Sequence, residues 1–255
     1  MKKLGIIAVG FLLVFVLVMV LLAVVFMNSM VKQGVETAGP LIAKVEMRLA
    51  ETDISLFSGK GTLRGLLIGN PEGYKTSAAI EVGEATIALK ASSLLTDKIL
   101  VRQVNVIAPE ITFEGSLKGS NLSKILENIR AFTASEGNAK EQPGGKSKKL
   151  QVDSFAITGG KIKLSVTALG GKALTVPLPD IHLRELGTGP EGVTPGELTE
   201  KVFREFFEGT TKAVAQALAG VGKEAIDTAK EVGQGAVKQV ENVTKGVTDL
   251  FKKKK

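Results

Sequence analysis

Two glycine-rich stretches come nearest, by residue type and spacing, to loops that bind phosphate or a dinucleotide. Gly144-Gly145-Lys146-Ser147 has the final lysine and serine of a phosphate-binding loop, but Lys140 stands where that loop requires its first glycine. Gly59-Lys60-Gly61 is followed by Arg64 where a dinucleotide fingerprint requires glycine, and by a predicted strand where it requires a helix. Both stretches therefore predict turns, and neither predicts a cofactor.

The chain holds one histidine, His182, and no cysteine. A zinc site of the usual kind needs several histidine or cysteine ligands, and a Ser-His or Cys-His nucleophile needs an orienting partner, so neither is predicted. Five carboxylates on or near predicted strands form no acid/base pair by spacing: Glu72, Glu81, Glu84, Glu110 and Glu114. We therefore predict no catalytic, cofactor-binding or metal-binding residues, and a protein that is not an enzyme.

The composition favours a lipid surface over nucleic acid as the charged partner. Aromatic residues make up 5% of the chain, whereas nucleic-acid binders interleave basic and aromatic residues on one face. The formal net charge is +7, and part of it is the terminal run Lys252 to Lys255. That run either binds anionic lipid or only solubilises the end of the chain. No nucleic-acid partner is predicted.

An uncharged apolar run from Leu4 to Met27, roughly 24 residues long, can cross a bilayer as a helix. Met1-Lys2-Lys3 precedes it and only Lys32 follows closely, so the positive-inside rule places the amino terminus in the cytoplasm. A cleaved signal peptide would need a shorter apolar core and a small-x-small cleavage site, which Ala23-Val24-Val25-Phe26 does not provide. We predict an uncleaved signal-anchor within residues 1–31.

A first block of strands is predicted after a short spacer that ends at Gly39-Pro40. Residues Ile42 to Ala50 alternate apolar and charged side chains, as a strand with one buried face does. Short strands over Ile54 to Phe57 and Thr62 to Ile68 flank a glycine turn. Asn70-Pro71-Glu72-Gly73 then predicts a type I turn.

Longer strands follow in the same block. Ala79 to Leu89 is predicted as a strand with a bulge near Gly83, where the alternation of apolar residues changes. Strands over Lys98 to Ile107 and Glu110 to Glu114 are separated by Pro109, which belongs at an edge or a kink.

A helix and a linker close the first block. Ser120 or Asn121 caps the helix, which must cover a sheet because its apolar residues recur at helical spacing: Leu122, Ile125, Leu126, Ile129 and Phe132. Thr133 to Lys149 lacks apolar periodicity and contains Pro143-Gly144-Gly145, so a mobile linker is predicted there.

The β pattern resumes after the linker. Strands are predicted over Leu150 to Thr158, Lys161 to Thr167, Lys172 to Leu178 and Ile181 to Leu183, with a hairpin at Leu169-Gly170-Gly171. This second block matches the first at one constant offset, because Val101, Val104, Val106, Ile111 and Phe113 align with Val152, Phe155, Ile157, Ile162 and Leu164. The match predicts two related halves.

From Pro195 onward the pattern becomes helical. Three phenylalanines open the region, and apolar residues then recur in steps of four, four and three as far as Phe251, an eleven-residue period that keeps one stripe straight along a helix. Valine and alanine dominate the stripe and glycines interrupt it, so the helix needs a surface on which to form.

The motifs around Leu63 to Tyr74 carry a resemblance to a known family. LRGLLIGNPEGY is followed by SSLLT at Ser92 to Thr96, then by ILVRQVNVIAPEITFE and NLSKILENI, and FAITGGKIKL and VPLPDIHL repeat the pattern after the linker. This order resembles the AsmA-like family of bacterial inner-membrane-anchored proteins, in which a strand leads into an Asn-Pro-x-Gly-aromatic turn. The residues that match this turn are Asn70, Pro71, Gly73 and Tyr74. The likeness covers about Leu4 to Gly187.

The resemblance implies an elongated β groove with an apolar lining, which in larger AsmA-like proteins is taken to carry phospholipid or to influence outer-membrane assembly. It also implies a single-pass protein of the bacterial inner membrane whose bulk lies in the periplasm. The expected partners are the lipid bilayer and either phospholipid acyl chains or envelope proteins, without a cofactor.

The sequence as a whole predicts a mainly β fold with α elements: one N-terminal transmembrane helix, a twisted antiparallel sheet or groove in two related halves, and a C-terminal amphipathic helix. The segments are 1–31, 40–132, 133–149, 150–190 and 195–255. Two alternatives to lipid handling stay open. One is a structural or interaction module whose C-terminal helix plugs the groove, and the other is a membrane-protecting protein of the late-embryogenesis-abundant type.

Overall fold

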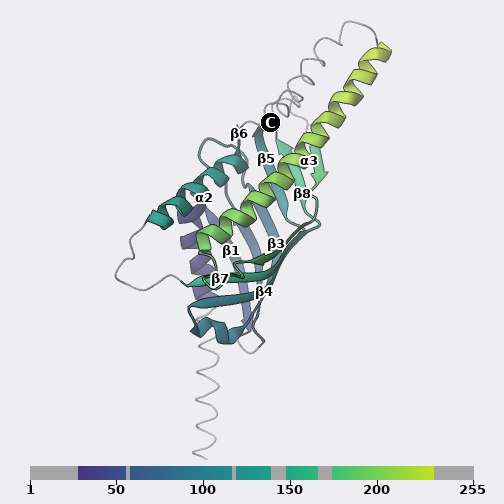
Figure 1. The fold of residues 1–255 in the computed structure, drawn as a ribbon. Coiled ribbons are helices and arrows are strands. Elements are labelled where there is room, and N and C mark those ends of the chain that lie inside the picture. Colours follow the sequence, from purple (N-terminus) through teal and green to yellow (C-terminus); the bar gives the residue numbers. More distant parts are fainter. Residues whose placement is uncertain (1–27, 56–57, 117–118, 139–147, 166–173, 233–255) are drawn as a thin grey trace, which may run out of the picture.

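A computed structural model describes residues 28–55, 58–116, 119–138, 148–165 and 174–232, except the side chains of 136–138 and 221–232. The predicted anchor Leu4 to Met27, the glycine-lysine stretch at Gly144, the hairpin loop at Leu169 and the terminal lysines lie outside these residues. Within them the fold is mixed α/β, with a single curled sheet of half-barrel shape and helices packed across its inner face (Figure 1).

The elements follow the predicted alternation of strands and helices. In chain order they are a helix over residues 28–43, β1 (Met47–Ser55), β2 (Lys60–Ile68), β3 (Ile80–Leu89), the short 3-10 helix η1 (Ala91–Leu95), β4 (Lys98–Ile107), β5 (Glu110–Ser116), β6 (Gly119–Ser120), α2 (Asn121–Asn138), β7 (Lys149–Thr158), β8 (Lys161–Ser165), β9 (Leu174–Pro177), β10 (Ile181–Leu186) and α3 (Pro195–Val232). None of the helices in this described part has the length and hydropathy that crossing a bilayer requires.

Several strands of the sheet are halves of longer, bent strands. β3 pairs antiparallel with both β4, at Glu84↔Ile107, and β5, at Ile80↔Ile111. β7 and β8 likewise lie beside β4 and β5, and β10 and β9 lie beside β7 and β8. With β1 and β2 added on the other side of β3 and the short β6 paired with β5, the ten strands form one sheet.

The prediction of an antiparallel sheet is wrong where the two blocks meet. β4 pairs parallel with β7, and β5 pairs parallel with β8. The physical reason is the connection: parallel neighbours need a long crossover, and the connection from β5 to β7 contains α2. The remaining neighbours pair antiparallel, as predicted.

The constant offset between the two blocks equals the register of this parallel pairing. Each matched pair of apolar residues consists of direct neighbours across the strands: Val101↔Val152, Val104↔Phe155, Val106↔Ile157, Ile111↔Ile162 and Phe113↔Leu164. The repeat therefore has a structural meaning, since it sets like side chains beside each other on one face of the sheet.

A line of backbone irregularity crosses the sheet where the strands bend. Gly65, Ala108 and Gly159 have positive φ angles of 63°, 47° and 66°, and they occupy corresponding places in β2, between β4 and β5, and between β7 and β8. Across this line the positions of the core-facing apolar residues change between odd and even, as from Phe155 and Ile157 to Ile162 and Leu164. The same face of the sheet therefore stays apolar on both sides of the line. The bulge predicted near Gly83 is instead a register shift between Ala88 and Leu89.

The core lies between the inner face of the sheet and the helices α2 and α3. Ile111, Phe113, Ile162 and Leu164 of the sheet are at most 3% exposed. The helices bury Leu122, Ile125, Leu126, Ile129, Phe203, Phe206 and Val214 against them. α2 starts at Asn121 as predicted, but it continues to Asn138, so the linker predicted from Thr133 begins too early.

The predicted spacer is wrong, and the strand predicted over Ile42 to Ala50 is confirmed only from Met47 onward. Residues 28–43 form a helix, which ends where Lys44 adopts a φ of 56°. β1 begins only at Met47 and runs without interruption to Ser55. The alternation from Ile42 to Ala50 joins the last helical turn to the first residues of β1, and alternation alone cannot separate the two.

This N-terminal helix covers the free edge of the sheet. The N–H of Leu49 donates to Glu36 Oε1 at 3.1 Å, and the N–H of Ile54 donates to Asn28 Oδ1 at 3.1 Å. Lys32 Nζ donates to the carbonyl of Ala50 at 3.3 Å. Since an edge strand otherwise presents unpaired N–H and C=O groups, these contacts protect β1 and fix the helix beside it.

Candidate functional site

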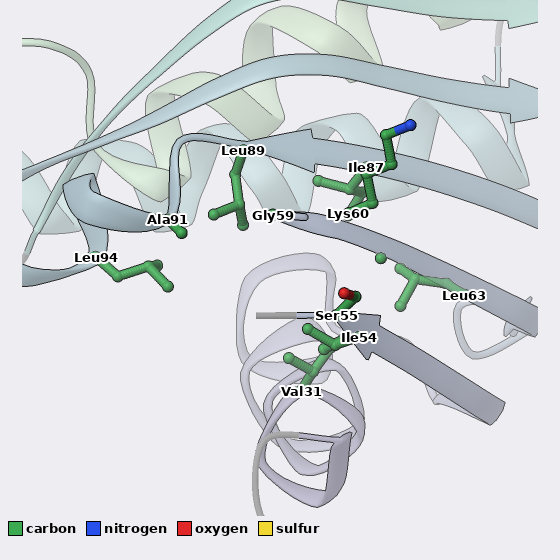
Figure 2. A pocket seen from close by; sticks show the side chains of 11 residues that line it. Val31, Ile54, Ser55, Gly59, Lys60, Leu63, Ile87, Leu89, Ala91 and Leu94 are labelled. Atoms are coloured by element: carbon green, nitrogen blue, oxygen red, sulfur yellow. The ribbon is translucent and has the colours of Figure 1, made fainter. Parts of the chain in front are cut away.

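An apolar pocket opens at the end of the sheet where β1, β2 and β3 meet η1 (Figure 2). Its volume is about 160 Å³, and its walls come from segments far apart in the sequence: Val31, Ile54, Ser55, Gly59, Lys60, Gly61, Leu63, Ile87, Leu89, Ala91 and Leu94. Apolar cavities of about 150 Å³ in other proteins stay dry and bind small hydrocarbons. The pocket is therefore large enough for part of an alkyl chain.

Strand register explains why the pocket walls are apolar. Ile54 pairs with Gly61, and Gly61 pairs with Ile87, so the three residues form one row across β1, β2 and β3. Leu63, two residues along β2, also packs against the main core, which places the row on the inner face. Gly61 leaves an opening in that row because it has no side chain.

The turn between β1 and β2 closes one side of the pocket. Gly59 has a φ of 66°, and its carbonyl accepts a hydrogen bond from the N–H of Leu89 at 2.7 Å. A Cβ at this position would lie 2.3 Å from the carbonyl oxygen of Leu89, so only glycine fits. The Gly59-Lys60-Gly61 stretch is thus a turn as predicted, and its glycines keep β2 close to β3.

The pocket offers shape and hydrophobicity rather than reactive groups. Lys60 and Ser55 are the polar side chains among its lining residues, and the others are aliphatic or glycine. In Figure 2 the side chains of Val31, Ile54, Leu63, Leu89 and Leu94 surround a common space. Such a site can bind a hydrocarbon by burial.

The predicted motif turn lies at the opposite end of β2 from the pocket. Asn70 is its centre: its Nδ2 donates to the carbonyl and the hydroxyl of Thr76 at 2.7 and 2.8 Å, and its Oδ1 accepts from Asn121 Nδ2 at 2.7 Å. Asn121 is fully buried and also donates to the carbonyl of Thr112. The asparagine pair therefore ties the turn to β5 and to the start of α2.

Pro71, Gly73 and Tyr74 form a turn of a different type from the predicted one. The N–H of Tyr74 donates to the carbonyl of Pro71 at 3.4 Å, so the turn starts one residue later than predicted. Gly73 has a φ of 94°, which is typical of the third position of a type II turn and not of a type I turn. Glycine is needed there for its backbone conformation.

Glu114 completes this polar cluster. Its carboxylate accepts hydrogen bonds from the hydroxyl of Thr76 at 2.6 Å and from the N–H groups of Thr76 and Lys75 at 2.8 Å. Burial raises the pKa of Glu114, but these hydrogen bonds and the charge of Lys75 outweigh it, and the pKa is lowered. Burial, with Glu114 and Glu127 acting in the same direction, raises the pKa of Tyr74. The cluster therefore holds the turn against β5 through hydrogen bonds.

The other residues considered for catalysis or metal binding do not come together in one site. His182 is exposed on β10, and its strand neighbour is Ala156. Glu84 pairs with Arg64 at 3.4 Å, and Glu110 pairs with Lys163, all on the surface. In the described ranges no group of three or more histidine, aspartate or glutamate side chains could hold a metal ion.

Sequence reasoning assigned the apolar strand residues of the pocket but did not bring them together. Ile54, Leu63, Ile87 and Leu89 are all apolar positions of predicted strands. Val31 belongs to the predicted anchor segment 1–31 and Leu94 to a predicted connection between strands. The signals that add them to the pocket are the helix over residues 28–43 and η1.

Comparison with known proteins adds no relative. No family model, curated protein or solved structure matches this chain. The resemblance to AsmA-like proteins therefore remains a proposal that rests on the motifs alone.

Proposed function

We propose that this chain is a non-enzymatic, membrane-anchored envelope protein of the AsmA-like type that binds the acyl chain of a lipid in the pocket between β1, β2, β3 and η1. In this proposal Leu4 to Met27 anchors the chain once in the bacterial inner membrane, and the bulk of the chain lies in the periplasm. Lipid transport or outer-membrane biogenesis is the process it would serve.

The observation that carries this proposal is the position of the pocket relative to the apolar run. Asn28 directly follows Met27 and accepts the N–H of Ile54, a pocket residue, at 3.1 Å. Val31, one helical turn later, lines the same pocket. An aliphatic cavity beside the point where the chain enters a predicted anchor is suited to a molecule that comes from the bilayer.

Native mass spectrometry of the full chain, released from nanodiscs, tests lipid binding. We expect phospholipid to remain bound to the chain, and we expect Ile87→Gln, which places an amide in the pocket, to lose it. Leu67→Gln is the matched control, since Leu67 lies between the core-facing Leu66 and Ile68 and so faces away from the core. A lipid-free, folded chain would count against the proposal.

A second candidate, an interaction module plugged by its own C-terminal helix, is favoured by the packing of α3. Phe203, Phe206 and Val214 are at most 9% exposed, and α3 contacts α2 and the strands β7 to β10. Under this proposal α3 fills the groove and leaves the outer surface for envelope partners. This candidate would be favoured if the chain bound no lipid, and if several variants of its outer surface all captured the same envelope protein.

A further inference from the structure

The most exposed large apolar side chain among the described residues belongs to Leu95, at 92%. Leu95 ends η1, and the residue before it, Leu94, lines the pocket. Solvent exposure of a leucine on a rigid turn costs free energy unless something covers it, and its burial favours contact by roughly tenfold or more. The position beside the pocket is therefore the first sign of a docking surface.

The start of the described chain lies at this same end of the sheet. Thr52 and Ile54 of β1 hydrogen-bond to the carbonyl and the side chain of Asn28 at 3.0 and 3.1 Å. Figure 1 shows η1 and the beginning of the N-terminal helix together at one end of the sheet. The uncharged run Leu4 to Met27 immediately precedes Asn28. A bilayer that holds this run must therefore lie close to Leu95.

Lysines lie on the segments next to Leu95 at what we call the η1 end, namely η1 with the residues that flank it from Lys90 to Lys98, the turn before β2 and the start of β7. They are Lys60, Lys90, Lys98, Lys148 and Lys149. Lys148 Nζ donates to the carbonyl of Leu94, and Lys98 Nζ donates to that of Gly189 at 2.7 Å. The adjoining segments bring three carboxylates, Asp53, Asp97 and Glu191. The η1 end therefore has a positive balance around an apolar tip.

We infer that the η1 end is a docking surface for an anionic bilayer, with Leu95 inserted at the boundary between headgroups and acyl chains and the lysines bound to lipid phosphates. An apolar side chain within a ring of basic residues is the combination that interfacial membrane contacts use. The inference rests on the proposed anchoring of the chain. It adds that the pocket opens toward the bilayer, so an acyl chain reaches Leu94 and Leu89 without crossing water.

The chain contains no cysteine, so a single cysteine can carry an environment-sensitive fluorophore. We would label Leu95→Cys in the full chain and, as the matched control, Glu72→Cys, an exposed residue beyond the other end of β2. Both proteins are reconstituted in vesicles with or without phosphatidylglycerol. The label at position 95 should be quenched by nitroxide-bearing lipid and protected from iodide, whereas the label at position 72 should behave in the opposite way.

Charge is tested in the Leu95→Cys background. Replacing Lys60 and Lys90 by glutamine should lower the equilibrium constant for docking on anionic vesicles by roughly fivefold per lysine. Nitroxide lipid should then quench the label less. The control pair is Lys75→Gln with Lys161→Gln, two exposed lysines away from the η1 end. Equal effects of the two pairs would overturn the electrostatic part of the inference.

A label at position 95 that iodide quenches as readily as the label at position 72 would overturn the inference. Protection from iodide without quenching by nitroxide lipid would also overturn it, because a protein or a second copy would then cover Leu95. Carbonate-resistant flotation of the same vesicles reports separately on the anchor. If Leu95 lies in the bilayer but native mass spectrometry finds no bound lipid, lipid binding in the pocket fails and the docking surface stands.

Discussion

Among single residues, Glu114 has the largest part in fixing the motif turn. Three donors from Lys75 and Thr76 converge on its carboxylate, and the N–H of Glu114 itself donates to Asn121 Oδ1 at 3.0 Å. The turn that resembles the family motif is therefore anchored by a residue outside that motif. The turn residues could be predicted from the sequence, but the contact of Thr76 with Glu114, 38 residues away, could not.

Glu114→Gln should destabilise the fold in a pH-dependent way. Because the folded pKa of Glu114 is lowered, its contribution is present above the ordinary pKa of glutamate, about 4.3, and is lost as the pH falls through the lowered value. We expect a loss of about 1 kcal/mol at pH 7, at the low end for charged hydrogen bonds because the carboxylate is partly exposed. Denaturant unfolding of the full chain in detergent at neutral and acid pH measures it.

The control for this prediction is Glu84→Gln, whose partner Arg64 is 3.4 Å away in an exposed ion pair, and which should change stability little at either pH. A destabilisation by Glu114→Gln that is as large at a pH below the lowered pKa of Glu114 as at pH 7 would contradict the account, since the wild-type carboxyl is then protonated and has lost its charge.

At the scale of elements, α3 packs against both α2 and the strands β7 to β10, contacts that the sequence does not predict. Its amphipathic pattern predicts a helix from Pro195, which the structure confirms, but the pattern does not say what the helix covers. The rings of Phe203 and Phe206 lie 5.4 Å apart within the core, against the sheet and α2. The first part of α3 is therefore integral to the fold.

Phe206→Ala should lower the free energy of unfolding by about 3–5 kcal/mol, because the substitution leaves a cavity in a site that is 4% exposed. Glu208→Ala, an exposed position on the same helix, is the control and should have a small effect. Thermal unfolding of the two variants gives the comparison. Similar unfolding temperatures would mean that α3 detaches from the sheet in solution, contrary to the structure.

Other elements show which structural features local sequence patterns predict and which they do not. Strands β4, β5, β7 and β8 have the predicted positions because alternation of apolar residues and the turn formers Pro109 and Gly160 mark them clearly. Whether two such strands pair parallel or antiparallel depends on the connection, which alternation does not encode. The sequence does not predict the helix over residues 28–43, because Gly39-Pro40 suggests a break. The helix nevertheless continues three residues past Pro40.

For the whole molecule, the pocket is a product of tertiary structure. It needs the N-terminal helix, the β1–β2 turn and η1 at the same end of a curled sheet (Figure 2). Each segment is ordinary on its own, and the sequence predicts only that one sheet face is apolar. The position of that face beside the predicted anchor is what connects fold to function.

The measurement that tests the central claim most directly is photocrosslinking of the full chain in nanodiscs with a phospholipid that carries a diazirine on its acyl chain. Gly61→Leu should fill the pocket, and the position admits a Cβ, which would lie 3.5 Å from Ile54 Cγ1, an ordinary contact. Gly83→Leu is the matched control, since a Cβ at that exposed position meets nothing within 4 Å.

We predict crosslinks on the peptides of β1, β2, β3 and η1 in the wild-type chain and in Gly83→Leu, and a reduction of roughly tenfold in Gly61→Leu. Equal crosslinking of these peptides in both variants, or crosslinks confined to Leu4 to Met27, would contradict the claim that this pocket binds a lipid acyl chain.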